Sequence, residues 1–180
     1  DEFQDTSNIQ WDNFLPLLKE SEASGGYNLI VGDVKQSIYR FRDSDWSLLG
    51  SRVAEQFPSS DVENMKENWR SAPRVVRFNN SFFKMASGRL GLSDLYSDVD
   101  QTPKNKDMDE DAGFVQISFC EDQNAKVLES IFMARENGAL WNDIAVLVRN
   151  NSEGSKIASM LIDSEIPVIS DDSLKISSSV

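Results

Sequence analysis

The chain opens with neighbouring carboxylates, a residue type that can serve in acid–base chemistry or bind a metal ion. Asp1 and Glu2 begin the hexapeptide Asp1-Glu2-Phe3-Gln4-Asp5-Thr6. An isolated Asp-Glu pair is usually a solvated surface pair, but the hexapeptide around it is a far more specific pattern. The sequence contains no histidine. Acid–base chemistry would therefore have to use carboxylates, and a histidine-based catalytic triad or metal centre is excluded.

Two further blocks carry polar side chains at positions where α/β proteins bind ligands. Residues 31–42 read Val-Gly-Asp-Val-Lys-Gln-Ser-Ile-Tyr-Arg-Phe-Arg and begin at the end of a short apolar run. This run is predicted to be a buried strand, and ligands bind in the crevice beyond the carboxyl ends of such strands. The other block is Asn68-Trp69-Arg70-Ser71, which lies just before a predicted helix.

The charges of the chain are unevenly distributed. The net charge of −12 has the wrong sign for a generic nucleic-acid binder. Residues 34–42 nevertheless hold three cations and no acid, and residues 65–77 hold four cations and one acid, whereas residues 98–113 hold six acids and two lysines. A charge run is usually a solvated face. The first basic cluster is unusual because its cations alternate with Tyr39 and Phe41.

Helices and strands in alternation must position these blocks. Apolar spacing predicts helices that begin at Thr6 or Ser7, at Ser44 or Asp45, after Ser71, near residue 127 and at Ser152. Apolar runs and alternation predict strands over residues 27–31, 61–66, 115–119, 143–148 and 166–169. This order indicates an α/β fold with a parallel sheet flanked by helices. Pro16 is expected to kink the first helix or to mark a restart.

The three blocks, in this order, resemble motifs II, III and IV of the UvrD/Rep branch of superfamily 1 helicases. Within that branch they are most similar to the AddA and RecB helicase–nuclease subunits, and residues 143–149 and 166–168 resemble the early second motor lobe. The resemblance implies incomplete RecA-like lobes of the P-loop NTPase type, with the chain starting at motif II. Residues 1–70 would belong to the first lobe and residues 71–180 to the second. Residues 90–111 carry none of the resemblance and are expected to form a loop or linker.

The resemblance assigns roles around ATP and Mg²⁺. Asp1 would hold Mg²⁺ through water, since magnesium keeps several waters and takes few carboxylates. Glu2 would orient or deprotonate the attacking water. Gln36 would sense the γ-phosphate, and Arg70 would reach the same phosphate from the second lobe, where a planar guanidinium suits phosphate oxygens.

The resemblance also implies that Tyr39, Phe41 and Arg42 face single-stranded DNA. Aromatic faces accept any base, as a sequence-indifferent translocase requires. Purely structural roles are also compatible with these residues. The two aromatics could be core residues, Arg70 could pair with Glu67, and Trp69 is more typical of a core or hinge position. Phe82, Phe83 and Met85 are expected in the core, and Arg74 and Arg77 are expected to be surface charges.

The phosphate-cradling pattern Gly-x-x-x-x-Gly-Lys-Ser/Thr does not occur in the sequence. We therefore expect the chain on its own not to hydrolyse ATP at a useful rate.

The expected role is part of a helicase/exonuclease subunit in double-strand-break repair and recombination, acting on single-stranded or duplex-end DNA with a partner helicase–nuclease subunit. A UvrD/Rep-like repair helicase without nuclease and a non-catalytic interaction module are the alternatives. No membrane segment or signal peptide is predicted, the single Cys120 suits a reducing cytoplasm, and an exposed sheet edge is expected to cause self-association.

Overall fold

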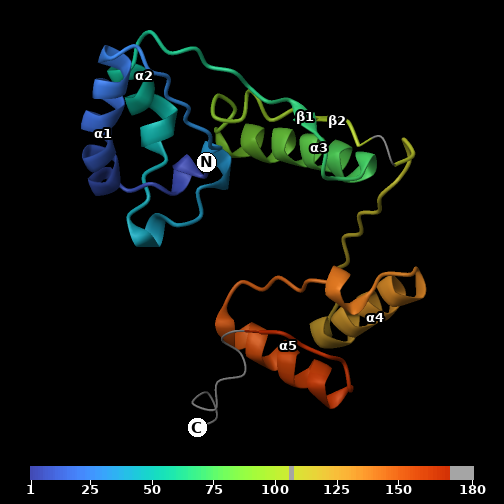
Figure 1. Cartoon of the computed structure of the whole chain (residues 1–180). Helices are drawn as coiled ribbons and strands as arrows, with labels where there is room; N and C mark the ends of the chain where they lie inside the picture. The colour runs from blue at the N-terminus through green and yellow to red at the C-terminus, as the bar shows by residue number, and fades with distance from the viewer. Residues whose placement is uncertain (106–107, 171–180) are drawn as a thin grey trace. The chain divides into compact units, whose positions relative to one another are not determined.

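The computed structural model describes residues 1–105 and 108–170, and packing divides the chain into two units that meet at Val115 and Gln116. Each unit is described by itself. The element order is given by the helices α1 (Asn8–Ala23), α2 (Val53–Gln56), α3 (Pro73–Leu90), α4 (Gln123–Glu136) and α5 (Asn151–Asp163), with the short strands β1 (Glu67–Asn68) and β2 (Thr102–Pro103) on either side of α3 in sequence (Figure 1). Single helical turns at Phe3–Asp5, Val34–Gln36, Arg40–Arg42, Leu48–Arg52 and Trp141–Asp143 complete the order.

Helix α1 begins where its sequence predicts. The Ser7 hydroxyl accepts a hydrogen bond from the backbone N–H of Gln10, and the Gln10 side chain accepts one from the N–H of Ser7, which together form a capping box. The helix continues through Pro16 to Ala23. The sequence predicts Ile9, Phe14, Leu17 and Leu18 as the apolar side of this helix. This prediction is wrong in part, because the first three are exposed while Leu18 packs against the core.

The core of the first unit is built on Trp11. Its ring meets Phe3 and Phe57 edge to face, with centroids 5.3 and 6.2 Å apart, and its indole N–H donates to the side chain of Gln56 at 2.7 Å. Leu48 lies in the same buried cluster and belongs to a π-helical turn, Leu48–Arg52, that leads into α2. This core fixes the acidic hexapeptide, since Phe3 belongs to it.

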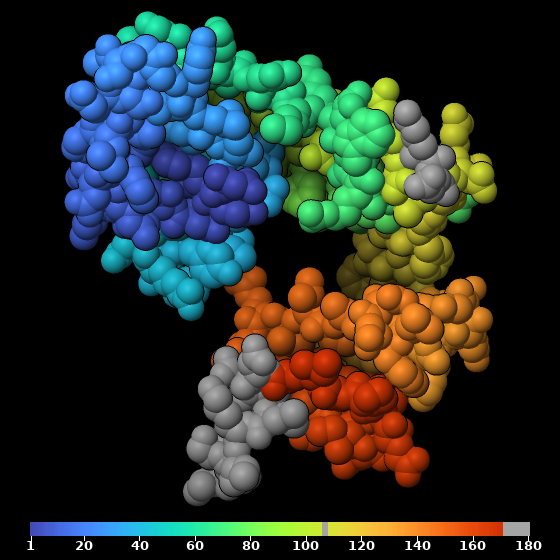
Figure 2. All heavy atoms as spheres, viewed as in Figure 1, coloured from blue at the N-terminus to red at the C-terminus, as the bar shows by residue number. Residues whose placement is uncertain are grey.

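Helix α3 is followed by a segment that turns back along it (Figure 1). Strands β1 and β2 pair in parallel, with Glu67 opposite Thr102 and Asn68 opposite Pro103. The side chain of Asn80 exchanges two hydrogen bonds with the backbone of Gln101. In Figure 2 the yellow-green atoms of this segment lie against the green atoms of α3. Residues 91–105 are therefore largely irregular in structure but closely attached to α3.

The prediction that Phe82, Phe83 and Met85 are core residues is wrong, since all three are exposed. The buried side of α3 instead carries Pro73, Val76 and Ser87. The rings pack on one another: Phe82 lies edge to face with Phe83, which stacks on Tyr96 with centroids 6.0 Å apart. The 3.6-residue apolar period therefore predicted helix α3 correctly, but it placed the side of the helix that carries Phe82 and Phe83 in the core, which is wrong.

The second unit packs α4 against α5. Its buried cluster is Ile131, Leu161 and Ile166, supported by half-buried neighbours such as Val127 and Ile144. Asp122 caps α4 by accepting from the N–H of Ala125 at 3.0 Å, and Asn150 caps α5 in the same way from Glu153. Helix α5 begins within one residue of its predicted start, and α4 contains the predicted helical positions from Val127 onward but begins four residues earlier, at Gln123.

The five predicted strands are wrong as strands. Residues 27–31, 61–66, 115–119, 143–148 and 166–169 are in no sheet of the described chain, and only β1 and β2 form a ladder. Leu29 is 86% exposed and Phe119 is 98% exposed. A strand is stable only with neighbours that accept its backbone hydrogen bonds and cover its side chains, and periodicity within one segment cannot supply those neighbours. The structure is mixed α and β with parallel pairing, which agrees with the predicted class at that coarse level.

Candidate nucleotide and nucleic-acid site

The acidic hexapeptide and the segment 31–37 lie directly against each other. The backbone N–H of Phe3 donates to the carbonyl of Val31 at 3.0 Å. The side-chain oxygen of Gln4 accepts from the N–H of Asp33 at 3.1 Å, and the Gln4 carbonyl accepts from the Ser37 hydroxyl at 3.3 Å. The structure therefore brings together two of the three blocks that the sequence singled out.

Gln4 also holds the second acid of the opening pair. Only 2% of Gln4 is exposed, and its amide nitrogen donates to Glu2 Oε2 at 2.5 Å. Glu2 itself has a left-handed backbone with φ of 57°. Gln4 thus ties the carboxylate of Glu2 to the backbone of Asp33 through a single side chain.

The site offers few protein ligands to a magnesium ion. Asp1 is exposed, and its carboxylate accepts the N–H of Glu2 at 2.9 Å. Among residues 1–105 and 108–170, no group of three acids or cysteines is arranged to hold a metal. A lone exposed carboxylate is compatible with Mg²⁺, which is commonly bound by one or two carboxylates together with water and substrate phosphates.

Gln36 forms a hydrogen bond with the carboxylate of Asp33. Its side-chain nitrogen donates to Asp33 Oδ2 at 3.1 Å, while Lys35 Nζ lies 2.9 Å from Asp33 Oδ1 and 3.2 Å from Asp98. Burial would raise the pKa of Asp33, but the hydrogen bonds from Lys35 and Gln36 outweigh it and lower that pKa. For Lys35 burial acts to lower the pKa, and the bonds to Asp33 and Asp98 raise it overall.

Gly32 leaves no room for a side chain at this junction. A Cβ atom at this position would lie 2.7 Å from Gln4 Oε1 and 3.0 Å from a methyl carbon of Leu49. The glycine therefore permits the close approach of the two blocks.

Tyr39, Phe41 and Arg42 form an exposed cluster. The two ring centroids are 5.9 Å apart, and the Arg42 guanidinium lies 5.4 Å from one centroid and 5.5 Å from the other. Phe41 is 76% exposed and Tyr39 is 37% exposed. Arg40–Arg42 is a helical turn rather than an extended segment, so the alternative that both rings are buried core residues is wrong.

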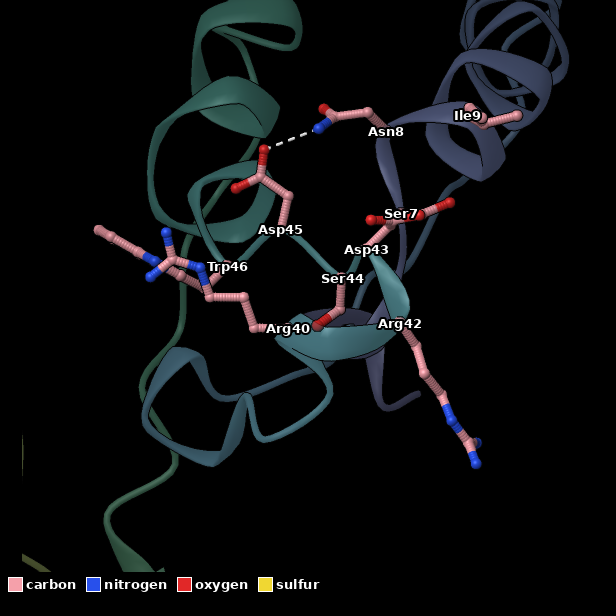
Figure 3. Close-up of a pocket in the computed structure, with 9 residues that line it drawn as sticks. All are labelled: Ser7, Asn8, Ile9, Arg40, Arg42, Asp43, Ser44, Asp45 and Trp46. Carbon is pink, nitrogen blue, oxygen red and sulfur yellow. Dashed lines mark hydrogen bonds between the residues drawn. The ribbon is translucent and has the colours of Figure 1, made fainter.

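Backbone and side-chain bonds connect this cluster to the acidic block. Ser7 and Ser44 form an antiparallel bridge, and the N–H of Asp45 donates to the Thr6 carbonyl at 3.1 Å. The Asn8 amide donates to Asp45 at 2.8 Å (Figure 3). Hydrogen bonds from the Ser47 hydroxyl and from Asn8 lower the pKa of Asp45. A hollow of about 590 Å³ lies beside this connection, lined by residues 7–9, Arg40 and residues 42–46.

Arg70 is placed differently from the other predicted residues. The Asn68 side chain accepts hydrogen bonds from the N–H groups of Arg70 and Ser71, and the Arg70 side chain is exposed. Glu67 pairs with Lys104 at 3.5 Å, so the alternative of a Glu67–Arg70 pair is wrong. Within residues 1–105 and 108–170, no ion pair or hydrogen bond joins Arg70 to Asp1, Glu2 or Gln36.

Comparisons with known protein families match two successive parts of the chain. Residues 1–58 match the UvrD/REP helicase N-terminal domain, and residues 64–176 match the UvrD-like helicase C-terminal domain. The chain belongs to the UvrD-like helicase family.

Individual relatives of this UvrD-like helicase chain are helicase–nuclease subunits and a helicase. It is 30% identical over 198 residues to an ATP-dependent helicase/nuclease subunit of Lactococcus lactis subsp. lactis strain IL1403 and 31% identical over 202 residues to the exonuclease/helicase subunit RexA of L. lactis subsp. cremoris strain MG1363. Each match covers 96% of this chain and 16% of the relative. DNA helicase II of Escherichia coli K12 is 28% identical, over 93% of this chain and 21% of the relative. The predicted resemblance is confirmed, and the chain spans about a sixth of the first of these relatives.

The sequence reasoning for this UvrD-like chain missed Gln4 and Gly32 as site residues. Both lie inside the blocks described above. Gln4 is uncharged and Gly32 is small, so neither stands out by charge or by aromatic character. A signal was present in the glycine, because a non-turn glycine after an apolar run often marks a close backbone approach. In the described part of this chain, no helix has the length and apolar character that a bilayer crossing demands.

Proposed function

We propose that this chain forms part of the motor of a DNA helicase that hydrolyses ATP and translocates on single-stranded DNA. By the names of its relatives, the whole protein would be a helicase–nuclease subunit, and we propose that it acts on broken DNA ends. The proposal includes RecA-like lobes, a cytoplasmic location and a partner helicase–nuclease subunit.

One observation carries the proposal: the junction at Gln4. It ties Glu2 to Asp33, which in turn holds Gln36, so the acid of one motif and the amide of the next share one hydrogen-bonded network. Phosphoryl transfer depends on positioning and charge neutralisation more than on covalent chemistry. A buried side chain that fixes the acid relative to the amide supplies that positioning.

Two residues of the network, Glu2 and Gln36, have capacity left for a nucleotide. Bound Mg²⁺ would neutralise phosphate charge, with Asp1 as its protein ligand. Glu2 Oε1 remains available to orient a water molecule, because Gln4 engages only Oε2. Gln36 uses one of its two amide hydrogens on Asp33 and keeps the other, together with its carbonyl, for a phosphate or a water molecule.

The exposed cluster of Tyr39, Phe41 and Arg42 suits single-stranded DNA. Exposed rings offer stacking surfaces worth about 1–3 kcal/mol per base, and a guanidinium beside them attracts the phosphate backbone. The links from Thr6 and Asn8 to Asp45 connect these rings to the acidic block. A movement at the nucleotide would therefore be transmitted to the bases.

A repair helicase without nuclease is the second candidate, and the match to DNA helicase II over 93% of this chain favours it. The motor residues would act in the same way in either protein. A non-catalytic interaction module is less well supported, because such a module would not need an acid, an amide and a glycine fitted together at one junction.

Binding of a fluorescently labelled oligothymidylate tests the proposal. We expect the chain to bind the oligonucleotide, and Tyr39→Ala or Phe41→Ala to weaken binding by about fivefold or more, as the loss of one stacked base predicts. Phe14→Ala is the matched control, since it removes an exposed ring from α1, away from the cluster. Equal affinity of the two ring variants and the wild-type chain would contradict the proposal.

A further inference from the structure

Two arginines at the start of α3 share one carboxylate. Asp111 Oδ1 lies 3.6 Å from an amino nitrogen of Arg74 and 3.8 Å from one of Arg77. About half of each arginine side chain and most of the aspartate side chain are exposed. The guanidinium groups therefore converge on a single anionic position at the surface of the first unit.

Backbone contacts fix Asp111 at this position. The N–H of Arg74 donates to the carbonyl of Ala112 at 3.0 Å, and the Arg77 guanidinium donates to the carbonyl of Glu110 at 2.7 Å. Gly113 follows with φ of 97°, and a Cβ atom there would lie 2.7 Å from the Cβ of Ala72. The chain thus passes close to the start of α3 and presents an acid to both arginines.

The same acidic segment meets other cations of the unit. Asp98 pairs with Lys35, and Asp100 pairs with Lys84 of α3. Each basic cluster predicted from the sequence therefore has a cation in contact with an acid from residues 98–111. Each of these carboxylates lies next to a cation, in a position that a phosphate of an anionic ligand could occupy instead.

We propose that Arg74 and Arg77 bind a phosphodiester of single-stranded DNA and that Asp111 is its internal competitor. The choice of single-stranded DNA as ligand rests on the proposed function. Arginine forks match phosphate oxygens in geometry and charge. Exposed ion pairs at such distances are weak, so a phosphate can displace the carboxylate without unfolding the segment that carries it. Asp111 then sets how strongly DNA is held.

Oligothymidylate binding by the whole chain over a series of salt concentrations tests this proposal. Asp111→Asn is expected to tighten binding by about two- to fivefold, the range of an exposed ion pair. Arg74→Ala is expected to weaken binding and to reduce the slope of log K against log salt by about 0.7, the value for one phosphate contact on a single strand. Arg74→Lys keeps the charge and is expected to restore the slope.

Matched variants separate the site from overall charge. Asp109→Asn removes one acid two residues away, and Arg89→Ala removes one cation from the far end of α3. Neither side chain has an ion-pair partner within residues 1–105 and 108–170. Both controls are expected to leave affinity nearly unchanged. If they change affinity as much as Asp111→Asn and Arg74→Ala do, overall charge explains the effect and the proposed site is wrong.

Other anions and the ring variants complete the test. Inorganic phosphate and ATP are titrated separately. If Asp111→Asn changes the affinity for either of these and leaves the affinity for the oligonucleotide unchanged, the choice of ligand is wrong. If Tyr39→Ala loses oligonucleotide binding while Arg74→Ala and Asp111→Asn behave as the wild-type chain, the proposed function stands and this inference fails. Absence of oligonucleotide binding by both the wild-type chain and Asp111→Asn would overturn it as well.

Discussion

Gln4 accepts a hydrogen bond from the backbone of Asp33, a residue 29 positions later in the chain, at 3.1 Å. The same amide donates to Glu2, and the side chain is almost completely buried. Two segments that carry the candidate chemistry are therefore joined by one uncharged side chain. Its removal affects both segments at once.

Gln4→Leu tests this junction. The substitution keeps a similar size but leaves the N–H of Asp33 without its acceptor, and an unsatisfied buried donor costs about 1–3 kcal/mol. We expect the free energy of unfolding to fall by that amount in urea denaturation. Asn13→Leu is the control, since Asn13 is an exposed residue of α1, and its change should stay within about 0.5 kcal/mol. Equal stability of Gln4→Leu and wild type would contradict the role of the junction.

Two glycines give a matched pair of substitutions with opposite expected signs. Gly32→Ala places a methyl group 2.7 Å from Gln4 Oε1 and is expected to destabilise the chain by about 1–3 kcal/mol. Gly88 lies within α3 with no atom near its would-be Cβ, so Gly88→Ala should stabilise it by about 0.5–1 kcal/mol. Thermal unfolding of both variants measures the difference. A stable Gly32→Ala would show that the two blocks can separate without cost.

The pKa shifts of Asp33 and Lys35 predict how stability depends on pH. The folded pKa of Asp33 is below its ordinary value of 3.8, so its stabilisation is present above pH 3.8 and is lost as pH falls toward the folded value. The folded pKa of Lys35 is above 10.5, so its contribution is present below that pH and is lost as pH rises through the folded value. Asp33→Asn should flatten the acid side of the stability curve. An unchanged acid slope in this variant would assign that loss to other carboxylates.

Self-association is predicted from the exposed segment 27–31. Tyr27 and Leu29 are exposed there, and apolar extended segments without sheet neighbours tend to pair with other chains. The net charge of −12 opposes contact between copies, so added salt should promote association through screening. Light scattering at increasing protein concentration measures it, with Leu29→Lys as the variant expected to associate less. A clean monomer at high concentration and high salt would contradict the prediction.

Local signals predicted the helices well. Ser7 was one of two predicted caps for α1, and α5 begins within one residue of its predicted start, because capping and apolar spacing are properties of neighbouring residues. The strands failed for the opposite reason. An apolar run such as residues 27–31 becomes a strand only through partners elsewhere, and one segment carries no information about whether these are present.

The sequence pointed to charged and aromatic candidates for the site but not to the connections between them. Tyr39, Phe41 and Arg42 were identified by motif, and the structure places them together on the surface. Gln4 and Gly32 were missed, because their importance lies in a fit between two segments rather than in their own chemistry. The attachment of Asp100 and Asp111 to α3 was also missed, although the opposite charges were visible in the sequence.

The exposure of Phe119 has a practical consequence for dissecting the molecule. Proteases bind their substrates in an extended form, and residues 116–120 lie outside any helix or strand and are exposed at the start of the second unit. Brief digestion with chymotrypsin, which cuts after aromatic residues, should therefore act at Phe119 and at the fully exposed Tyr27 before it reaches the enclosed Trp11. The cut at Phe119 would release a piece that holds α4 and α5, which could be purified from the intact chain and studied separately.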